Sequence, residues 1–195
     1  KYSVLALLTA HLVWRGLIPA FTAVDTDFPN YYVASQLALE GEFDRVYDDL
    51  WFQEQIRSAG VASMGKFSPY PPLTAFVMMP LAWLGPLNAL RVWTVINIAV
   101  LLCSIMLLSQ MLKMDWLWSA LMLLLSGHAL VNNFRFGQFY LILTLLTLWS
   151  LSCFFFANAI ATNTPESDAL LWPRFLILFA LPLWLHLTLE LIAMG

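Results

Sequence analysis

The sequence contains little charge. Only 11% of its 195 residues are charged, whereas 61% are hydrophobic and the mean hydropathy is positive. About a quarter of the residues are charged in ordinary soluble domains. The composition therefore excludes a soluble globular protein and predicts an all-α integral membrane protein that has membrane lipids as neighbours. No basic patch points to nucleic acid as a partner.

Cysteine is also scarce, and Cys103 and Cys153 both lie inside apolar runs. Thiols in such positions are typical of buried structural residues and not of disulfides or metal ligands. No His or Cys spacing indicates zinc, and neither a glycine-rich phosphate loop nor a serine triad is present. We therefore expect no metal site and no cofactor.

Long apolar runs predict about five or six transmembrane helices, in a single membrane domain over residues 1–195. Tyr2–Thr22 is long enough to cross a hydrocarbon core of about 30 Å. Pro71–Gly85 is short and contains Pro80, so we favour an interfacial or re-entrant segment over a crossing one. The helical bundle of residues 70–194 then contains the remaining predicted spans: Leu90–Leu112, Trp116–Val131, Phe139–Ala161 and Leu170–Met194.

Residues 23–69 form an acidic loop between the first span and the bundle. Eight of the twelve acidic residues but only three of the nine basic residues lie in it. Lys113, in a short turn, favours the cytoplasmic side for that turn, and the acidic composition of the loop favours the outside for the loop.

Two surface helices are predicted inside this loop. The first covers Asn30–Gly41, with Gly41 as its C-cap, and the second covers Asp48–Ala59, with acidic residues at its start. Their apolar residues are expected to face lipid or protein: Tyr31, Leu37, Trp51 and Ile56.

Three polar or proline-rich interruptions between the apolar runs could meet at one membrane face. The first contains Asp25 and Asp27, the second contains Tyr70, and the third contains Arg135 and Gln138. A carboxylate near the membrane surface can act as a general base, and Asp27 is the first candidate. We expect the carboxylates, Tyr70 and Arg135 to lie within about 15 Å of one another, because reacting groups must flank one substrate.

Structural roles are open for several of these residues. Asp25 and Asp27 could cap the following helix, Tyr31 could be an interfacial aromatic, and Arg135 could anchor the chain at the headgroups. Arg15 lies within the first span, where a charge is costly enough to indicate function or pairing, although it could also extend towards the helix end.

The order of three elements resembles glycosyltransferase family 87. The first is Asp27-Phe28-x-x-Tyr31-Tyr32-x-Ala34-Ser35, followed by Gly41. The second is Tyr70-Pro71-Pro72-Leu73 with Pro80 seven residues after Leu73, and the third is Gly137-Gln138 at the start of an apolar helix. The resemblance extends over about residues 1–160.

This resemblance implies a GT-C-type membrane enzyme that takes sugar from a polyprenyl-phosphate donor. It implies ten or more transmembrane helices and a large first extracytoplasmic loop that carries the catalytic acid, in a bacterial cytoplasmic membrane. The chain has about half that number of spans, and after Ala161 it lacks the Lys-Pro-type element expected in the next helix, so we expect a partial or shortened member.

Two functions follow as alternatives. In a transferase, Asp27 or Asp25 would take the proton of the acceptor hydroxyl. The leaving phosphate would need cationic or hydrogen-bonding partners, for which Arg135, Lys66 and Gln138 are candidates, and Tyr31 and Tyr70 would contact the substrate. The alternative is a non-catalytic subunit, derived from such an enzyme, that packs against other membrane subunits.

Overall fold

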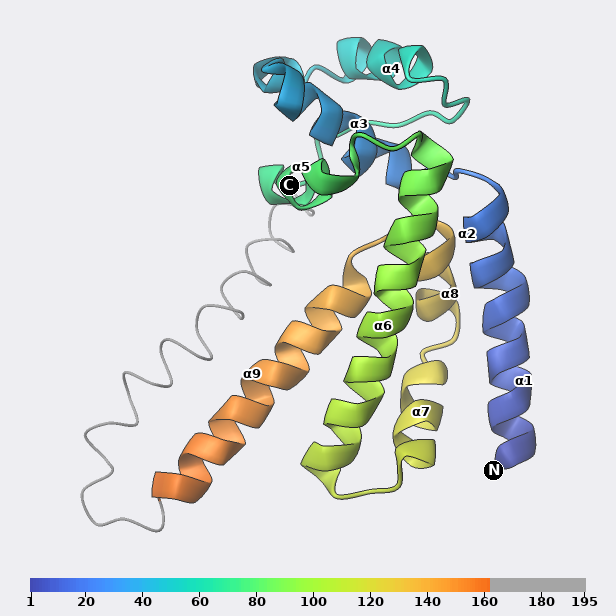
Figure 1. The fold of residues 1–195 in the computed structure, drawn as a ribbon, viewed down its shortest axis with the longest axis vertical. Coiled ribbons are helices and arrows are strands. Elements are labelled where there is room, and N and C mark those ends of the chain that lie inside the picture. Colours follow the sequence, from blue (N-terminus) through green and yellow to red (C-terminus); the bar gives the residue numbers. More distant parts are fainter. Residues whose placement is uncertain (162–195) are drawn as a thin grey trace.

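The structure, a computed structural model, describes residues 1–161, with side chains to residue 157, and this part of the chain is all-helical. Its elements are α1 (Tyr2–Leu12), η1 (Val13–Leu17), α2 (Ile18–Thr22), α3 (Phe28–Glu40), η2 (Phe43–Arg45), α4 (Asp49–Ser58), α5 (Pro72–Met78), η3 (Met79–Leu81), α6 (Pro86–Leu112), α7 (Trp116–Leu124), α8 (His128–Arg135) and α9 (Tyr140–Ala161). Figure 1 shows the long helices below and α3 and α4 above them.

Three helices in the described part are long and apolar enough to cross a membrane. They are Tyr2–Thr22, formed by α1, η1 and α2 together, then α6, and then α9. Many of their large apolar side chains are exposed, as expected for helices that face lipid; examples are Leu102 and Met106 on α6 and Phe156 on α9. The predicted span Leu170–Met194 lies outside the described residues.

The predicted span Trp116–Val131 is not one continuous helix. Helix α7 ends at Leu124 and α8 begins at His128, and the two axes are bent by 79°, as in a broken span or a re-entrant loop. Gly127, between them, has a φ of +55°, which side-chain-bearing residues rarely adopt. Counting the bent pair as one span gives at most four candidate spans among the described residues.

The segment predicted as interfacial or re-entrant forms a short helix. Pro72–Leu81 is a ten-residue apolar helix made of α5 and η3. At about 1.5 Å per residue its length is roughly half of the hydrocarbon thickness. It is therefore too short to cross a membrane, and it lies beneath α3 (Figure 1).

Both segments predicted as surface helices are helical. Helix α3 begins at Phe28, two residues before the predicted start, because Pro29 suits the first turn of a helix, and Gly41 ends it with a φ of 82°. Asp48 caps α4: its side chain accepts a hydrogen bond from the Trp51 backbone N–H at 3.2 Å.

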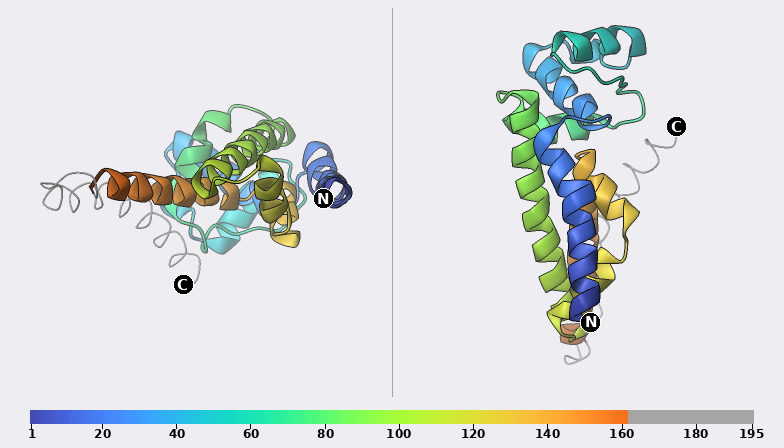
Figure 2. Two further views of the ribbon diagram at one scale, coloured as in Figure 1. Left: turned by 90° about the horizontal axis from the view of Figure 1, so that it is seen from below. Right: turned by 90° about the vertical axis from the view of Figure 1, so that its right-hand side faces the viewer.

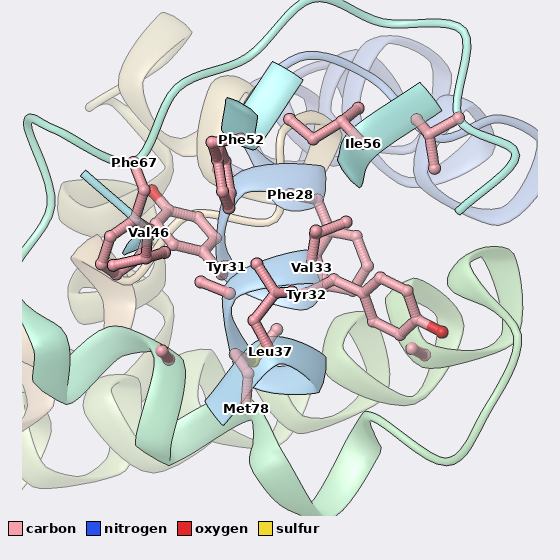
Figure 3. Packing of buried hydrophobic residues seen from close by; sticks show 14 of the residues in the cluster. Phe28, Tyr31, Tyr32, Val33, Leu37, Val46, Phe52, Ile56, Phe67 and Met78 are labelled. Carbon is pink, nitrogen blue, oxygen red and sulfur yellow. The ribbon is translucent and has the colours of Figure 1, made fainter. Parts of the chain in front are cut away.

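An aromatic-rich core fixes α3 on the end of the bundle. Tyr31 and Leu37 of α3 are buried, as is Ile56 of α4, and Trp51 is partly buried against the same cluster. Figure 3 shows that α4 covers α3 from one side while Met78 of α5 contributes from the other. A second cluster, which includes Leu12, Leu101 and Phe134, joins the first span, α6 and α8. The segment between α2 and α3 thus lies between two packed clusters of buried side chains.

Candidate functional site

The two carboxylates lie in the short connection between α2 and α3, at the end of the bundle where α8 ends and α9 begins (Figure 1). Asp27 occupies the N-cap position of α3, yet its side chain makes no capping hydrogen bond. Its Oδ2 instead accepts a hydrogen bond from Gln138 Nε2 at 2.6 Å. A side-chain cap is therefore the wrong interpretation of Asp27: its carboxylate faces the turn before α9.

Asp25 forms an ion pair with Arg135. Arg135 Nε donates to Asp25 Oδ2 at 2.9 Å, and the backbone N–H of Thr26 donates to the other carboxylate oxygen at 2.9 Å. The side chains of Arg135 and Asp25 are 42% and 31% exposed. Both groups can therefore be reached from outside the protein, and an anionic ligand could compete with Asp25 for the guanidinium.

The turn between α8 and α9, which follows Arg135 and carries Gln138, depends on Gly137. This residue has a φ of 64°, and a Cβ there would come within 2.7 Å of Phe28 Cδ2. The indole N–H of Trp93 donates to the Gly137 carbonyl at 2.8 Å. A residue without a side chain lets the turn approach α3 closely, and this approach places Gln138 against Asp27.

A buried pair of asparagines, Asn97 and Asn133, also holds the turn between α8 and α9. Asn133 Nδ2 donates to Asn97 Oδ1 at 3.0 Å, and Asn97 Nδ2 donates to the Trp93 carbonyl at 3.0 Å. Asn133 Oδ1 accepts the backbone N–H of Leu141 at 3.2 Å. Both asparagines are 1% exposed. They connect α6, α8 and the start of α9, so they set where the turn between α8 and α9 lies.

Tyr31 and Tyr70 form the wall of the site next to Asp27. Their ring centroids are 4.8 Å apart in an edge-on arrangement, and Phe139 meets Tyr31 from another direction at 5.0 Å. Burial raises the pKa of Tyr31 well above its ordinary value, and nearby Tyr70 and the Asp27 carboxylate raise it further. Burial and Asp27 also raise the pKa of Tyr70, although the hydrogen bond from Asn30 opposes this shift. Both phenols therefore stay protonated at neutral pH and can donate hydrogen bonds.

Two amide oxygens in this region are buried without a hydrogen-bond partner among the described residues. They are Gln138 Oε1 and Asn30 Oδ1. Leaving such groups unpaired costs about 1–3 kcal/mol each. Gln138 holds Asp27 through its amide nitrogen, so its free oxygen lies next to the carboxylate.

An apolar groove begins at Tyr31, Tyr70 and Gln138. It has a volume of about 200 Å³ and runs between α5 and α9, with Tyr31, Tyr70 and Gln138 in its lining. The rest of the lining is mostly apolar and includes Val77 and Leu146. A groove with polar groups in part of its wall and hydrocarbon over the rest can hold an amphiphile, whose head would then lie beside the Asp27–Gln138 pair.

The structure brings six of the seven candidate residues together and leaves one apart. Asp25 with Arg135, Asp27 with Gln138, and Tyr31 with Tyr70 form three contacting pairs. Lys66 is exposed between α4 and α5, and its side chain makes no hydrogen bond or ion pair with a described residue.

Sequence reasoning missed the residues that position the site. Asn97 and Asn133 could have been noticed as polar side chains inside or next to apolar helices, where such residues usually find partners. Trp93 and Phe139 gave no signal, because aromatic residues are common throughout this chain.

Residues 67–162 match the model of glycosyltransferase family 87. The matched segment contains Tyr70, Arg135 and Gln138 and begins after the two carboxylates. No curated protein and no solved structure matches the chain.

Proposed function

We propose, from the premise that residues 67–162 belong to glycosyltransferase family 87, that the chain carries a glycosyl-transfer site. The reaction moves a sugar from a polyprenyl-phosphate donor to a hydroxyl of a lipid or glycan acceptor. It takes place at the outer face of the cytoplasmic membrane, the side on which we place the acidic loop.

The contact between Asp27 and Gln138 is the observation that supports this most directly. It joins a carboxylate outside the matched segment to an amide within it, and that amide lines an apolar groove. The carboxylate has one oxygen held by Gln138 at 2.6 Å. No other hydrogen bond from a described side chain reaches it. Asp27 is therefore oriented and still able to accept a proton.

The reaction can be written with these groups in place. Asp27 takes the proton of the acceptor hydroxyl as its oxygen attacks the anomeric carbon of the donor. The bond between that carbon and the phosphate oxygen breaks, and the electron pair leaves with the polyprenyl phosphate. A single displacement of this kind inverts the anomeric configuration. Arg135 stabilises the charge on the leaving phosphate. The neutral phenols of Tyr31 and Tyr70, which line the groove, can donate hydrogen bonds to the substrate.

The groove between α5 and α9 would hold part of the polyprenyl chain. Its lining is largely apolar, and it starts at the residues that flank Asp27. A hydrocarbon chain bound there is removed from water, which is favourable by about 25 cal/mol per Å² of apolar surface. Such a groove explains why transfer would occur at a membrane boundary.

A non-catalytic subunit is the second candidate, and one observation favours it. Each carboxylate already has a partner from the bundle, Arg135 for Asp25 and Gln138 for Asp27. The same contacts could serve only to tie the acidic loop to the helices. In that case they would stabilise the fold, and the site would turn over no substrate.

A transfer assay separates the two candidates. The purified chain in liposomes is given labelled hexosyl and pentosyl polyprenyl phosphates with lipid and glycan acceptors, and the labelled product is measured. We expect transfer by the wild type and none by Asp27→Asn. Asp44→Asn is the matched control, because Asp44 is an exposed acid of the same loop. No transfer by the wild type with any donor, or full transfer by Asp27→Asn, contradicts the proposal.

A further inference from the structure

Arg15 is a charged residue in the middle of the first candidate span. It is exposed, and its side chain makes no ion pair or hydrogen bond with a described residue. A cation placed within an apolar helix costs several kcal/mol unless it finds a partner or reaches water. The end of α2, at Thr22, lies seven residues away, or about 10 Å along the helix. Arg15 thus lies about two helical turns inside the end of the span and has no partner among the described residues.

The local backbone holds Arg15 next to the end of α8. Val13–Leu17 forms a π-helical turn, a geometry that occurs frequently at functional sites. In this turn Gly16 lies so close to α8 that a Cβ would be 3.3 Å from the Val131 carbonyl and 3.4 Å from Phe134 Cβ. The right-hand view of Figure 2 shows the first helix passing alongside α8. Arg15 is therefore fixed near the end of α8, where Arg135 lies.

Arg15 and Arg135 line one cleft. Its volume is about 330 Å³, and its other lining residues include Asp25, Trp14 and Ile18. Two guanidinium groups and one carboxylate give it an excess of one positive charge. Asp25 is already held by Arg135 and by the backbone of Thr26, so within this cleft Arg15 is the cation that has no counter-ion among the described residues.

This cleft is separate from the apolar groove beside Asp27. The two have no lining residue in common: Arg135, the last residue of α8, lines the cleft, and Gln138, in the turn after α8, lines the groove. The cleft opens along a helix whose exposed face carries Trp14 and Ile18. A ligand in it would have an anionic group beside the arginines and hydrocarbon beside this face.

We propose that this cleft binds the phosphate group of a membrane lipid, with Arg15 and Arg135 as its cations. Guanidinium groups recognise phosphate through paired hydrogen bonds, and two of them here approach one space from different helices. The ligand carries its phosphate at the head of a hydrocarbon chain, as polyprenyl phosphates and phospholipids both do. Binding of such a lipid does not require sugar transfer, so the two can be measured independently.

Lipid binding to the full chain in phospholipid-free detergent tests this, with dissociation constants read by native mass spectrometry. The probes are a polyprenyl monophosphate, the matching polyprenol without phosphate, phosphatidylglycerol, and inorganic phosphate as a competitor. We expect the wild type to prefer the polyprenyl monophosphate to the polyprenol. We expect Arg15→Gln to lose this preference by about tenfold or more, since hydrogen bonds to a charged group are removed.

Four further variants keep the test independent of folding defects. Arg15→Lys keeps the charge and should retain much of the preference, whereas Arg57→Gln removes an exposed charge of the acidic loop and should change nothing. Thr22→Glu adds a negative charge to the wall of the cleft without altering either arginine, and it should weaken phosphate binding. Thr26→Glu, at an exposed position outside the lining, is its control.

The probes distinguish the sources of the phosphate. A preference for the polyprenyl monophosphate over phosphatidylglycerol assigns the cleft to the donor or its product, and equal binding assigns it to membrane headgroups. Both results support the proposal. Equal affinities of the wild type and Arg15→Gln for every phosphate overturn it, and so does binding of inorganic phosphate with no preference among the lipids. If the wild type transfers no sugar but Arg15→Gln still binds the lipid phosphate more weakly than the wild type does, that result supports this inference and contradicts the proposed function.

Discussion

Arg135 Nε lies 2.9 Å from Asp25 Oδ2, although the two residues are 110 positions apart in the sequence. The pair connects the segment between α2 and α3 to the end of α8. Because both side chains are partly exposed, solvent screens the attraction, and such pairs contribute about 0.2–1 kcal/mol to stability. An exposed pair of this kind stabilises the fold weakly and leaves the guanidinium available to a ligand.

Arg135→Ala should therefore weaken donor binding more than it weakens the fold. We expect the unfolding free energy to fall by less than about 1 kcal/mol. The KM for the donor should rise by about tenfold or more, as the phosphate loses a charge-assisted partner. Arg135→Lys should restore part of the affinity. Arg57→Ala, an exposed arginine of α4, is the control. A large loss of stability with an unchanged KM would show that the pair is structural.

The two carboxylates should respond differently to the same amide substitution. Asp27→Asn keeps the size of the side chain and an oxygen that can accept from Gln138 Nε2, but it cannot take a proton. We expect the kcat to fall by at least about 10²–10⁴ with donor binding largely kept. Asp25→Asn should reduce the kcat less, because Asp25 is held by Arg135 and its loss acts through that partner. Steady-state transfer rates together with donor binding measure both effects, and a larger loss in Asp25→Asn would reverse the assignment.

The helices were largely predictable from sequence because their signals are local. Apolar length predicted Tyr2–Thr22 and the long helices α6 and α9, and Gly41 and Asp48 marked helix ends through their own backbone and capping chemistry. The break at Gly127 was missed because a glycine in an apolar run is also compatible with a continuous helix. The bend places α8 against the first span, and that packing depends on residues distant in the sequence.

The residues of the site were predictable one by one, but their pairing was not. Asp27 and Gln138 each stood out as polar residues at the edge of an apolar run, yet nothing in either segment indicates that one binds the other. Their contact depends on Gly137 lying against Phe28 and on Trp93 holding the Gly137 carbonyl. These are tertiary relations among α3, α6 and the turn, and no local pattern encodes them.

Gly137→Ala tests how closely the turn must approach α3. A Cβ would meet Phe28 Cδ2 at 2.7 Å, and alanine is strained at a φ of 64°. We expect the unfolding free energy to fall by about 1–3 kcal/mol, a range that covers both backbone strain and overpacking, and transfer to fall with it as Gln138 moves from Asp27. Gly85→Ala is the matched control, since nothing lies within 4 Å of the added Cβ. Equal stability of the two variants would contradict the proposed close approach.

Asn133→Leu should reveal whether the buried asparagines position the turn. The substitution leaves the Leu141 N–H and Asn97 Oδ1 without their partners, at a cost of about 1–3 kcal/mol. We expect a lower kcat with a smaller change in KM, because the turn is displaced while the donor groove remains. Asn132→Leu is the neighbouring control, and its side chain has no described partner. If both variants lose activity equally, the asparagine pair has no special role in positioning the turn.

The raised pKa of Tyr31 predicts a dependence of stability on alkaline pH. In the unfolded chain this phenol ionises near pH 10, whereas in the folded chain burial, helped by Tyr70 and the Asp27 carboxylate, keeps it protonated. Above about pH 10, ionisation of Tyr31 therefore lowers the free energy of the unfolded state but not that of the folded state. The stability contributed by Tyr31 is fully present below that pH and falls by up to about 1.4 kcal/mol for each further pH unit.

Tyr31→Phe removes this penalty, so its unfolding free energy should decline less steeply than that of the wild type between pH 9 and pH 11, a window set around about pH 10. Unfolding in detergent, followed by circular dichroism at each pH, measures the difference, and other titrating groups cancel because both proteins contain them. Tyr2→Phe, which removes a hydroxyl from an exposed residue, is the control. At neutral pH Tyr31→Phe should lose a little stability, because the contact between the Tyr31 and Tyr70 hydroxyls disappears. Parallel pH profiles of Tyr31→Phe and the wild type would mean that the Tyr31 phenol is not buried against Asp27 in the folded protein.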